Sequence, residues 1–230
     1  MNINPTNNVT FGWNTATHLV ITEEALNEFA ELKPFEKRWT ARCSQLPDLM
    51  KEEIQDCISP HFYDVLHEDP SFGTVNDDIN NAFSRFLMHH IKAIEASKKG
   101  DRDLFLRETG YAAHYLQDAA TPPHTEHGNY LHKLFRLPMH CWFEKSKKYG
   151  AKYKSDVFIK NHKPEEIPVS SLAALLHNNA LFTVQPENLV RYHNMKSWHN
   201  IQQRCFDRSL NSTKAYFKEV LKLLPKCVQL

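Results

Sequence analysis

Residues 76–119 read NDDINNAFSRFLMHHIKAIEASKKGDRDLFLRETGYAAHYLQDA, and this stretch carries two successive helical patterns. Residues 76–99 place apolar side chains three or four positions apart, which is typical of an amphipathic helix. Gly100 can end that helix, and Asp101 can cap a second one over 102–119. The apolar stripe of the first helix consists of Ile79, Phe83, Phe86, Leu87, His90 and Ile94.

The rest of the chain shows the same apolar periodicity and no pair of alternating strand-like runs with a hairpin turn. The two prolines of TPPHTEHGN, residues 121–129, break the helical pattern and predict a loop. The basic segment 145–163 is also loop-like. Further helices are predicted over 16–32, 130–148, 169–183, 185–197 and 199–224. The predicted fold class is therefore all-α, a single-domain bundle of many helices.

The composition excludes several classes of protein. The chain has 230 residues with 28 Lys+Arg and 27 Asp+Glu, whereas nucleic-acid-binding domains usually carry a basic excess. A hydrophobic content of 41% argues against disorder. No run of 18 apolar residues occurs, so no membrane span is expected. The unusual count is that of histidine, because nine of the 14 lie between residues 61 and 140.

The N-terminal residues MNINPTNNVTFGW lack the basic and apolar regions of a secretory signal peptide. We therefore expect secretion or export by a route that this sequence does not show, with a cytoplasmic location as the alternative. The five cysteines form no CxxC pair, so a thiolate zinc site is not expected. Free, buried thiols are the expectation, and a disulfide between Cys43 and Cys57 is the alternative.

Two His/carboxylate pairs, with a histidine between them, form the strongest chemical pattern. His114 and Asp118 are four residues apart, so both project from one face of a helix. His140 and Glu144 repeat this spacing on the next predicted helix, and His124 lies in the proline loop between them. Imidazole and carboxylate are the usual protein ligands of catalytic zinc. The sequence therefore predicts a metal cluster in a cleft between helices.

Four residues extend this pattern upstream. Asp48 lies in the turn-like segment LPD, His61 lies in PHFYD, and Trp13 precedes His18 by five residues. With AHYLQD and HCWFE, this ordered set resembles the superfamily of zinc-dependent phospholipases C and fungal single-strand nucleases. The forms HFYD and AHYLQD are closer to the bacterial phospholipase C branch. The resemblance covers residues 13–144 through nine motif positions.

The resemblance implies an α-helical domain over residues 13–230 that binds two or three zinc ions, after an N-terminal extension over 1–12. By position, the first zinc is held by Asp48, His61, His114 and Asp118, the second by His124, His140 and Glu144, and the third by Asp118, His18 and Trp13. In the family the third zinc is chelated by an N-terminal Trp, whereas Trp13 follows twelve residues here. Either the chain is cleaved before Trp13, or fewer protein groups bind the third ion, or that ion is absent.

The resemblance further implies a phosphodiester hydrolase, namely a phospholipase C that cleaves a phospholipid into diacylglycerol and a phosphorylated head group. Close metal ions can clamp the phosphodiester oxygens and ionise a water near neutral pH. Asp48 is the catalytic candidate that orients or deprotonates this water. A single-strand nuclease is the alternative, although the near-neutral charge weighs against nucleic acid as a partner. A non-enzymatic helical interaction protein is the further alternative.

We expect a monomer that contacts a membrane surface transiently, without a transmembrane span. In choline-specific relatives, aromatic residues near the catalytic Asp and the HFYD histidine form a cation-binding box. Leu49 and Ile58 stand near those places here, so we expect altered or loose recognition of choline.

Overall fold

The computed structural model describes residues 15–49, 63, 81–125, 151–188 and 198–226 of the chain. Within these residues every regular element is a helix, which confirms the all-α class predicted from the sequence. In this part of the chain no helix is long and apolar enough to cross a membrane.

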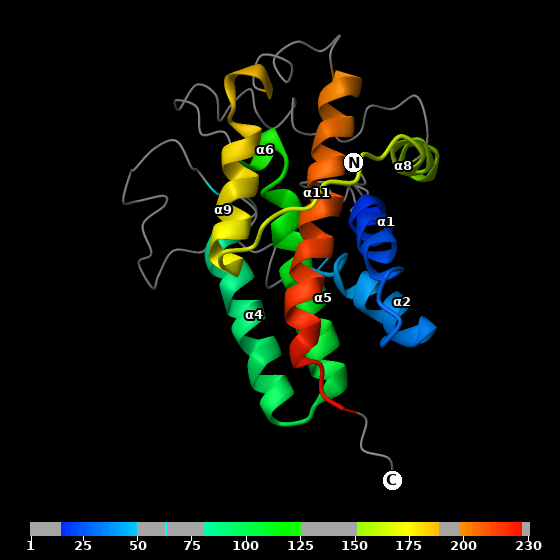
Figure 1. The fold of residues 1–230 in the computed structure, drawn as a ribbon, viewed down its shortest axis with the longest axis vertical. Helices are drawn as coiled ribbons and strands as arrows, with labels where there is room; N and C mark the ends of the chain where they lie inside the picture. Colours follow the sequence, from blue (N-terminus) through cyan, green and yellow to red (C-terminus); the bar gives the residue numbers. More distant parts are fainter. Residues whose placement is uncertain (1–14, 50–62, 64–80, 126–150, 189–197, 227–230) are drawn as a thin grey trace, which may run out of the picture.

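A pair of antiparallel helices, α4 (Ala82–Lys98) and α5 (Arg102–Asp118), forms the centre of the fold (Figure 1). Asp101 caps α5 as predicted, because its side chain accepts a hydrogen bond from the N–H of Leu104 at 2.9 Å. Gly100 lies in the turn between the helices with a φ of 73°, a left-handed conformation that glycine adopts without steric cost.

Helix α4 begins at Ala82 rather than at the predicted residue 76, because Asn81 caps it. Oδ1 of Asn81 accepts a hydrogen bond from the N–H of Ser84 at 2.8 Å, and Oγ of Ser84 accepts one from the N–H of Asn81 at 3.0 Å. This reciprocal pair is a capping box, which sets the first residue of the helix. The remaining residues of the predicted start, 76–80, lie outside the described residues.

The buried face of α4 differs from the predicted apolar stripe. Only Phe86 of the described stripe residues is fully buried, whereas Phe83, Leu87, His90 and Ile94 are half-buried. The residues of α4 that face the core are Ala82, Phe86, His89, Ala93 and Ala96. Three of these are alanines, which let α4 pack closely against α5, so fit between the two helices decides which face is buried.

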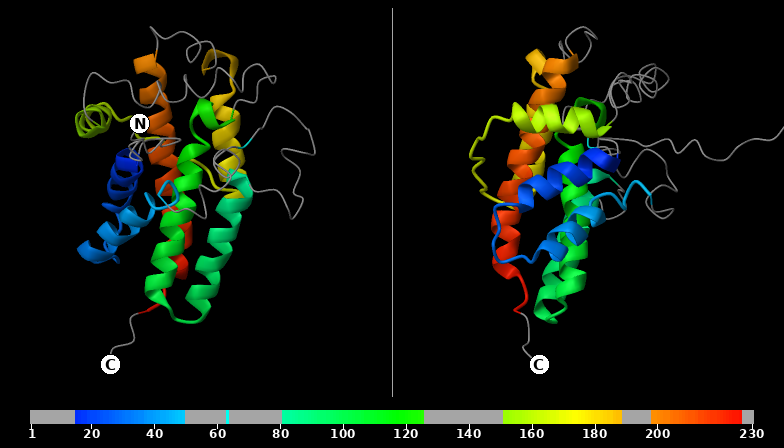
Figure 2. Two further views of the ribbon diagram at one scale, coloured as in Figure 1. Left: turned by 180° about the vertical axis from the view of Figure 1, so that it is seen from behind. Right: turned by 90° about the vertical axis from the view of Figure 1, so that its right-hand side faces the viewer.

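Helix α5 is the central helix of the bundle. From Phe105 to Asp118 all of its residues except Arg107 are buried. Figure 2 shows α4 and α9 on one side of α5, and α1 and α2 on the other. The surrounding helices are α1 (Thr15–Leu26), α2 (Pro34–Cys43), α9 (Leu172–Thr183) and α11 (Trp198–Val220). The largest fully buried side chains of the core include Tyr115, Tyr216, Phe86, Phe105, Phe206 and Phe217.

Three segments differ from the predicted helices and loops. The helix predicted over 16–32 ends at Leu26, and α2 follows it without having been predicted. Pro34 opens α2, where a proline costs little because the first turn has no partner for its backbone N–H. Helix α8 (Ala151–Lys160) forms within the segment predicted as a basic loop, and α6 (Pro122–Thr125) adds one turn to the predicted proline loop.

The other predicted helices are either confirmed or outside the described residues. Helices α9 and α11 confirm the predictions over 169–183 and 199–224, and α11 continues as the 3-10 turn η3 (Leu221–Leu223). The predicted helix over 130–148 and residues 189–197 lie outside the described residues.

A close contact at Gly110 holds α2 against α5 near the residues predicted to bind metal. A Cβ atom on Gly110 would lie 2.5 Å from the backbone oxygen of Thr40 and 2.7 Å from Cβ of Cys43. Only glycine fits there without a shift of the neighbouring helix. The contact fixes the end of α2, from which the chain continues to Ser44 and Asp48.

A partly buried ion pair holds the other end of α2. Nε of Arg102 donates to Oε1 of Glu36 at 2.6 Å, and Nη2 donates to Oε2 at 3.1 Å. Nη1 of Arg102 donates to the carbonyl oxygen of Pro225 at 2.6 Å, which attaches the end of the described chain to the same point. The hydrogen bonds from Arg102 hold the pKa of Glu36 below its ordinary value of 4.5.

Glu36→Gln is expected to lower the free energy of unfolding at neutral pH by about 2 kcal/mol, because charge-assisted hydrogen bonds to a buried carboxylate are lost. Since the folded pKa of Glu36 is lowered, its contribution is present above the unfolded pKa and is lost as the pH falls through the folded pKa. Urea unfolding at neutral and acid pH measures both effects. Glu95→Gln, at an exposed glutamate of α4, is the control, and an equal loss in both variants would contradict the prediction.

Candidate metal centre

Five side chains of metal-binding type converge beside the C-terminal end of α5. His114 and Asp118 are one helical turn apart on α5, so they face the same way. His18 comes from α1, Asp48 from the turn after α2, and His124 from α6. Figure 1 shows α1 and α6 near this end of α5. All five residues are buried, so the site lies within the bundle.

Asp118 lies at the centre of this cluster. Its Oδ2 is 3.2 Å from Nε2 of His114, and its Oδ1 is 3.4 Å from Nε2 of His18 and 3.2 Å from Nδ1 of His124. Asp48 lies farther out, with its carboxylate 3.7 Å from Nε2 of His114 and 3.9 Å from Nε2 of His18. The ring centroids of His18 and His114 are 4.1 Å apart. Two carboxylates and three imidazoles therefore point their ligand atoms at one small volume.

This spacing fits a metal ion. Donors that are each about 2 Å from a tetrahedral ion lie about 3.3 Å from one another. One ligand atom from each of His18, Asp48 and His114 lies within 4.8 Å of the other two. Nε2 of His18 is buried and makes no hydrogen bond with any described residue. Since a buried polar atom costs free energy unless it is coordinated, this cluster could hold a metal ion.

The charged groups of the cluster change one another's protonation. Burial raises the pKa of Asp118, but His124 and His114 outweigh this effect and hold it well below the usual range. Burial lowers the pKa of His18, but the carboxylates of Asp118 and Asp48 raise it above its ordinary value of 6.5. A divalent cation competes with protons for the same lone pairs, so metal binding here should release protons.

A backbone carbonyl orients the ring of His114. Nδ1 of His114 donates a hydrogen bond to the carbonyl oxygen of Ser44 at 2.9 Å. Because a carbonyl oxygen can only accept, the ring proton is on Nδ1 and Nε2 turns its lone pair toward Asp48 and Asp118. Metal-binding histidines are usually held by such a bond from their second ring nitrogen.

The side chain of Gln117 orients the ring of His18. Nε2 of Gln117 donates to the hydroxyl groups of Thr22 at 2.9 Å and of Thr213 at 3.3 Å. Its Oε1 is thereby directed at His18, where it accepts a hydrogen bond from Nδ1 at 2.7 Å. The ring proton of His18 is therefore also on Nδ1, and its Nε2 faces Asp118.

Ser44 ends the hydrogen-bond network that begins at Gln117. Its Oγ donates to the carbonyl oxygens of Ala41 at 2.7 Å and, less favourably, of His18 at 3.2 Å. It therefore accepts from the hydroxyl of Thr22 at 3.0 Å, and the donors run from Gln117 through Thr22 to Ser44. All three are fully buried, in surroundings where each hydrogen bond is strong and each loss is costly. Ser44 thus supports both histidine orientations, one through its hydroxyl and one through its carbonyl.

The structure leaves part of the predicted ligand set untested. Trp13, His61, His140 and Glu144 lie outside the described residues. The distribution of the nine residues among individual ions therefore stays a prediction. Tyr63 of the HFYD motif is described, and its N–H donates to the carbonyl oxygen of His124 at 2.8 Å. Tyr63 therefore lies beside His124, which belongs to the cluster.

The residues that orient the ligands were not found from the sequence. No local pattern distinguishes Ser44, Thr22 and Thr213 from other hydroxyl residues. Gln117 had one local indication, its position directly before Asp118 in HYLQD. Its side chain joins α5 to α1 through His18 and to α11 through Thr213, and the local sequence does not predict these contacts.

Other described histidines pair with structural partners. His90 is half-buried, and burial lowers its pKa. The pairs are His89 with Glu108 at 2.7 Å, His162 with Asp207 at 2.9 Å, and His177 with the hydroxyl of Tyr63 at 3.0 Å.

Cys43 and Cys205 are free and buried, and burial raises the pKa of Cys43 to about 12. The alternative of a Cys43–Cys57 disulfide is therefore wrong.

Comparison with known proteins shows similarity in fold. No family model matches the chain, and no curated protein matches it. The alpha-toxin of Clostridium perfringens, from an avian strain, has a TM-score of 0.66 at 17% identity, over 94% of this chain and 66% of the toxin. The alpha-toxin of Clostridium absonum has a TM-score of 0.59 at 16% identity, over 97% of this chain and 67% of the toxin. The chain thus spans about two thirds of these toxins and shares their helical fold, which is the fold that the sequence resemblance implies.

Proposed function

We propose that the chain is a zinc-dependent phosphodiester hydrolase, a phospholipase C that cleaves glycerophospholipids to diacylglycerol and a phosphorylated head group. The observation that carries this proposal is the buried cluster in which three histidines lie within 3.4 Å of Asp118, with Asp48 beside them. The motif resemblance over residues 13–144 supports it. The fold shared with alpha-toxins, which are bacterial phospholipase C toxins, supports it as well.

The number of donors supports more than one ion. A tetrahedral zinc ion binds four ligands, and in a catalytic site one of these four is water or substrate. Five donor residues converge here, which is more than one such ion would use. Asp118 has both oxygens directed at histidines, which suits a carboxylate shared between two ions. Two or three zinc ions would use these donors together with the predicted ligands outside the described residues, which are Trp13, His61, His140 and Glu144.

The chain's own residues would orient the metal and accept a proton in the reaction. Zinc in such a site supplies a Lewis acid for the phosphodiester and a water that ionises near neutral pH. His18 and His114 would hold the metal in fixed orientations, because Gln117 and Ser44 fix their ring protons. Asp48 lies farther from both histidines than Asp118 does. It is therefore the carboxylate best placed to accept the proton of the attacking water while also binding metal.

In the described part of the chain, the residue that directly follows Asp48 is aliphatic rather than aromatic. This residue is Leu49, which is 49% exposed. An aliphatic group cannot bind a quaternary ammonium as the face of an aromatic ring does. This supports a head-group preference that does not depend on choline.

Metal analysis combined with substrate assays tests the proposal. Two or three zinc ions per chain and comparable hydrolysis of phosphatidylcholine and phosphatidylglycerol are expected. Fewer than one zinc per chain would contradict the metal centre. Bound zinc with cleavage of single-stranded nucleic acid alone would favour the nuclease alternative, and bound zinc with neither activity would favour an interaction protein.

A further inference from the structure

The outward face of α2 combines exposed aromatic and cationic side chains. Phe35 and Trp39 are four residues apart, and they are 56% and 41% exposed. The ammonium group of Lys33 lies 5.9 Å from the centre of the Phe35 ring. Arg38 and Arg42 are exposed on the same helix. These five residues (Lys33, Phe35, Arg38, Trp39 and Arg42) are called the α2 face below.

The opposite side of α2 is already occupied by the fold. Its buried residues pack against α1 and α5, and they are Glu36, Thr40, Ala41 and Cys43. Glu36 is the one acidic residue of this helix, and its charge is paired with Arg102 inside the protein. The α2 face therefore carries cations with no carboxylate of its own helix among them.

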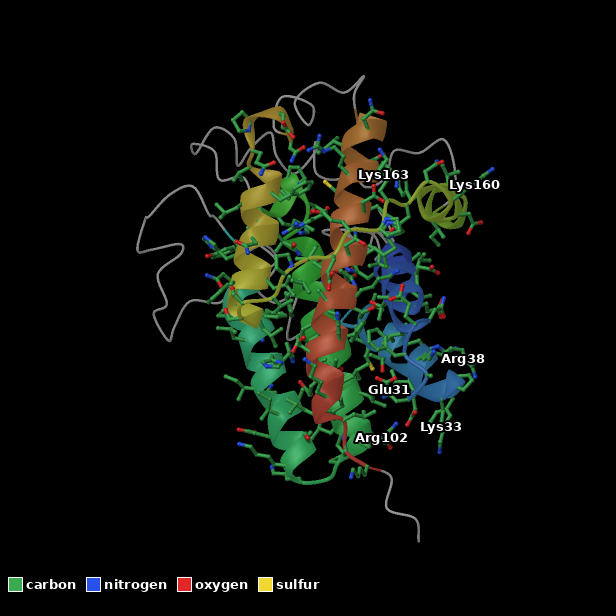
Figure 3. The ribbon with its side chains drawn as sticks, viewed as in Figure 1. Glu31, Lys33, Arg38, Arg102, Lys160 and Lys163 are labelled. Atoms are coloured by element: carbon green, nitrogen blue, oxygen red, sulfur yellow. The ribbon has the colours of Figure 1, made fainter. Side chains whose placement is uncertain are left out.

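The nearest acidic side chain along the chain lies to one side of this face. Glu31 precedes the helix, and its carbonyl oxygen accepts a hydrogen bond from Arg102 at 3.4 Å. Figure 3 shows Glu31 on the side toward Arg102, whereas Lys33 and Arg38 lie at the outer side of α2, away from the other helices. The positive charge of the face is thus directed to solvent.

This combination fits the surface of an anionic bilayer. Tryptophan and phenylalanine insert into the head-group region, and neighbouring Lys and Arg side chains interact with anionic lipids. Two large aromatic rings in water forgo the hydrophobic stabilisation that such contact provides. A second copy of this chain fits less well, because two α2 faces would bring like charges together.

The chain leads from α2 directly to the metal centre. Helix α2 ends at Cys43, and the segment that follows it carries Ser44 and Asp48. Leu49, the residue after Asp48, is a further exposed apolar residue of this part of the chain. A bilayer held against α2 would thus lie close to the segment that supplies Asp48.

We infer that the α2 face binds an anionic phospholipid surface and brings the metal centre to its lipid. The purpose of this binding rests on the proposed phospholipase C activity, whereas the binding itself does not. The chemistry that recognises the partner is a negatively charged layer of lipid phosphates above an apolar interior.

Co-sedimentation of the full chain with vesicles, after brief contact, tests the inference. The wild type should bind vesicles of phosphatidylcholine mixed with phosphatidylglycerol more tightly than vesicles of phosphatidylcholine alone. The triple variant Lys33→Gln, Arg38→Gln, Arg42→Gln should bind the mixed vesicles roughly a hundredfold less tightly, at roughly fivefold for each cation removed. Phe35→Ala with Trp39→Ala should weaken binding to both kinds of vesicle.

Matched variants on other helices are the controls. Lys92 and Lys98 are exposed on α4 and Lys99 directly after it, and their replacement by Gln removes the same charge. Ile91 and Leu181 are exposed apolar residues of α4 and α9, and their replacement by Ala removes apolar surface of the same kind. Neither control should change vesicle binding by more than about twofold. Equal losses in the controls, or no preference of the wild type for anionic vesicles, would overturn the inference.

A water-soluble substrate separates this inference from the proposed function. Hydrolysis of a short-chain phospholipid in monomeric form requires the metal centre and no bilayer, so the α2 variants should keep the wild-type kcat/KM on it. On mixed vesicles the same variants should need more lipid to reach half-maximal rate. If the wild type binds anionic vesicles but does not hydrolyse the monomeric lipid, the proposed function is wrong. The inference that the α2 face binds anionic phospholipid is then retained.

Discussion

Asp118→Asn should abolish hydrolysis and remove most of the bound metal. Both carboxylate oxygens of Asp118 face histidines, at 3.2 to 3.4 Å, so this side chain contacts all three histidines of the cluster. An amide of the same shape has one oxygen and no charge, and it cannot serve two metal-facing directions. Since metal ions supply several kcal/mol of transition-state stabilisation, we expect turnover to fall roughly a thousandfold or more.

Asp101→Asn is the matched control for this variant. Asp101 lies at the other end of α5, where its side chain caps the helix by accepting from the N–H of Leu104. Asparagine caps helices about as well as aspartate, so metal content and turnover should stay at the wild-type level. Metal analysis, circular dichroism and the rate on a monomeric lipid distinguish the two variants. A folded Asp118→Asn protein with full zinc content would contradict the assignment of Asp118.

The helices that the sequence predicts well have clear end residues. Helix α5 begins after Asp101 and ends at Asp118, within one residue of the predicted bounds. Asp101 and Gly100 are local determinants, so they can be recognised from their neighbours alone. The buried face of α4 could not be recognised in this way. Its alanines are selected by the distance to α5, which is a property of the packed pair.

Helix α2 was missed because its pattern is the reverse of an ordinary surface helix. The buried side consists of small or polar residues such as Thr40 and Ala41, and one of them is Glu36. The large apolar residues Phe35 and Trp39 face the solvent. An apolar stripe is expected to face the core, so the apolar pattern of these residues does not predict a helix packed in this orientation. Because its large apolar residues face solvent, the outward face of α2 is a candidate surface for a partner.

The candidate metal site was predictable where local geometry creates it. The i,i+4 spacing of His114 and Asp118 follows from the helical repeat, and the structure brings both into the cluster. The network behind the ligands was not predictable, because it joins residues that lie far apart in the chain. Gln117 is 99 positions from His18 and 96 from Thr213, and no local pattern encodes such contacts. The low identity to the alpha-toxins, 16% and 17%, limits their guidance to the fold.

Gln117→Leu is expected to weaken zinc binding tenfold to a hundredfold without unfolding the protein. Leucine fills the same space but offers no oxygen to Nδ1 of His18, so the ring is free to move its proton to the nitrogen that faces Asp118. Residues that accept a hydrogen bond from the second ring nitrogen of a metal-binding histidine typically contribute tenfold to a hundredfold to metal affinity. The hydroxyl of Thr22 keeps its bond to Ser44, so the loss in stability should be about 1 to 2 kcal/mol.

Gln117→Glu separates orientation from simple packing. A carboxylate at this position keeps an oxygen acceptor for Nδ1 of His18, so zinc affinity should return to within about tenfold of the wild type. Gln203→Leu, on α11, is the control for loss of a glutamine elsewhere, because its amide donates to Asp207 at 3.0 Å and to the carbonyl of Phe158 at 3.1 Å. Competition with a chromogenic chelator measures the affinities, and the rise in Tm on adding zinc gives a second readout. If Gln117 only fills space, the Leu and Glu variants will bind zinc alike. If it orients His18, the Leu variant will lose more affinity than the Glu variant, because a neutral imidazole is a good ligand only when its lone pair points at the metal.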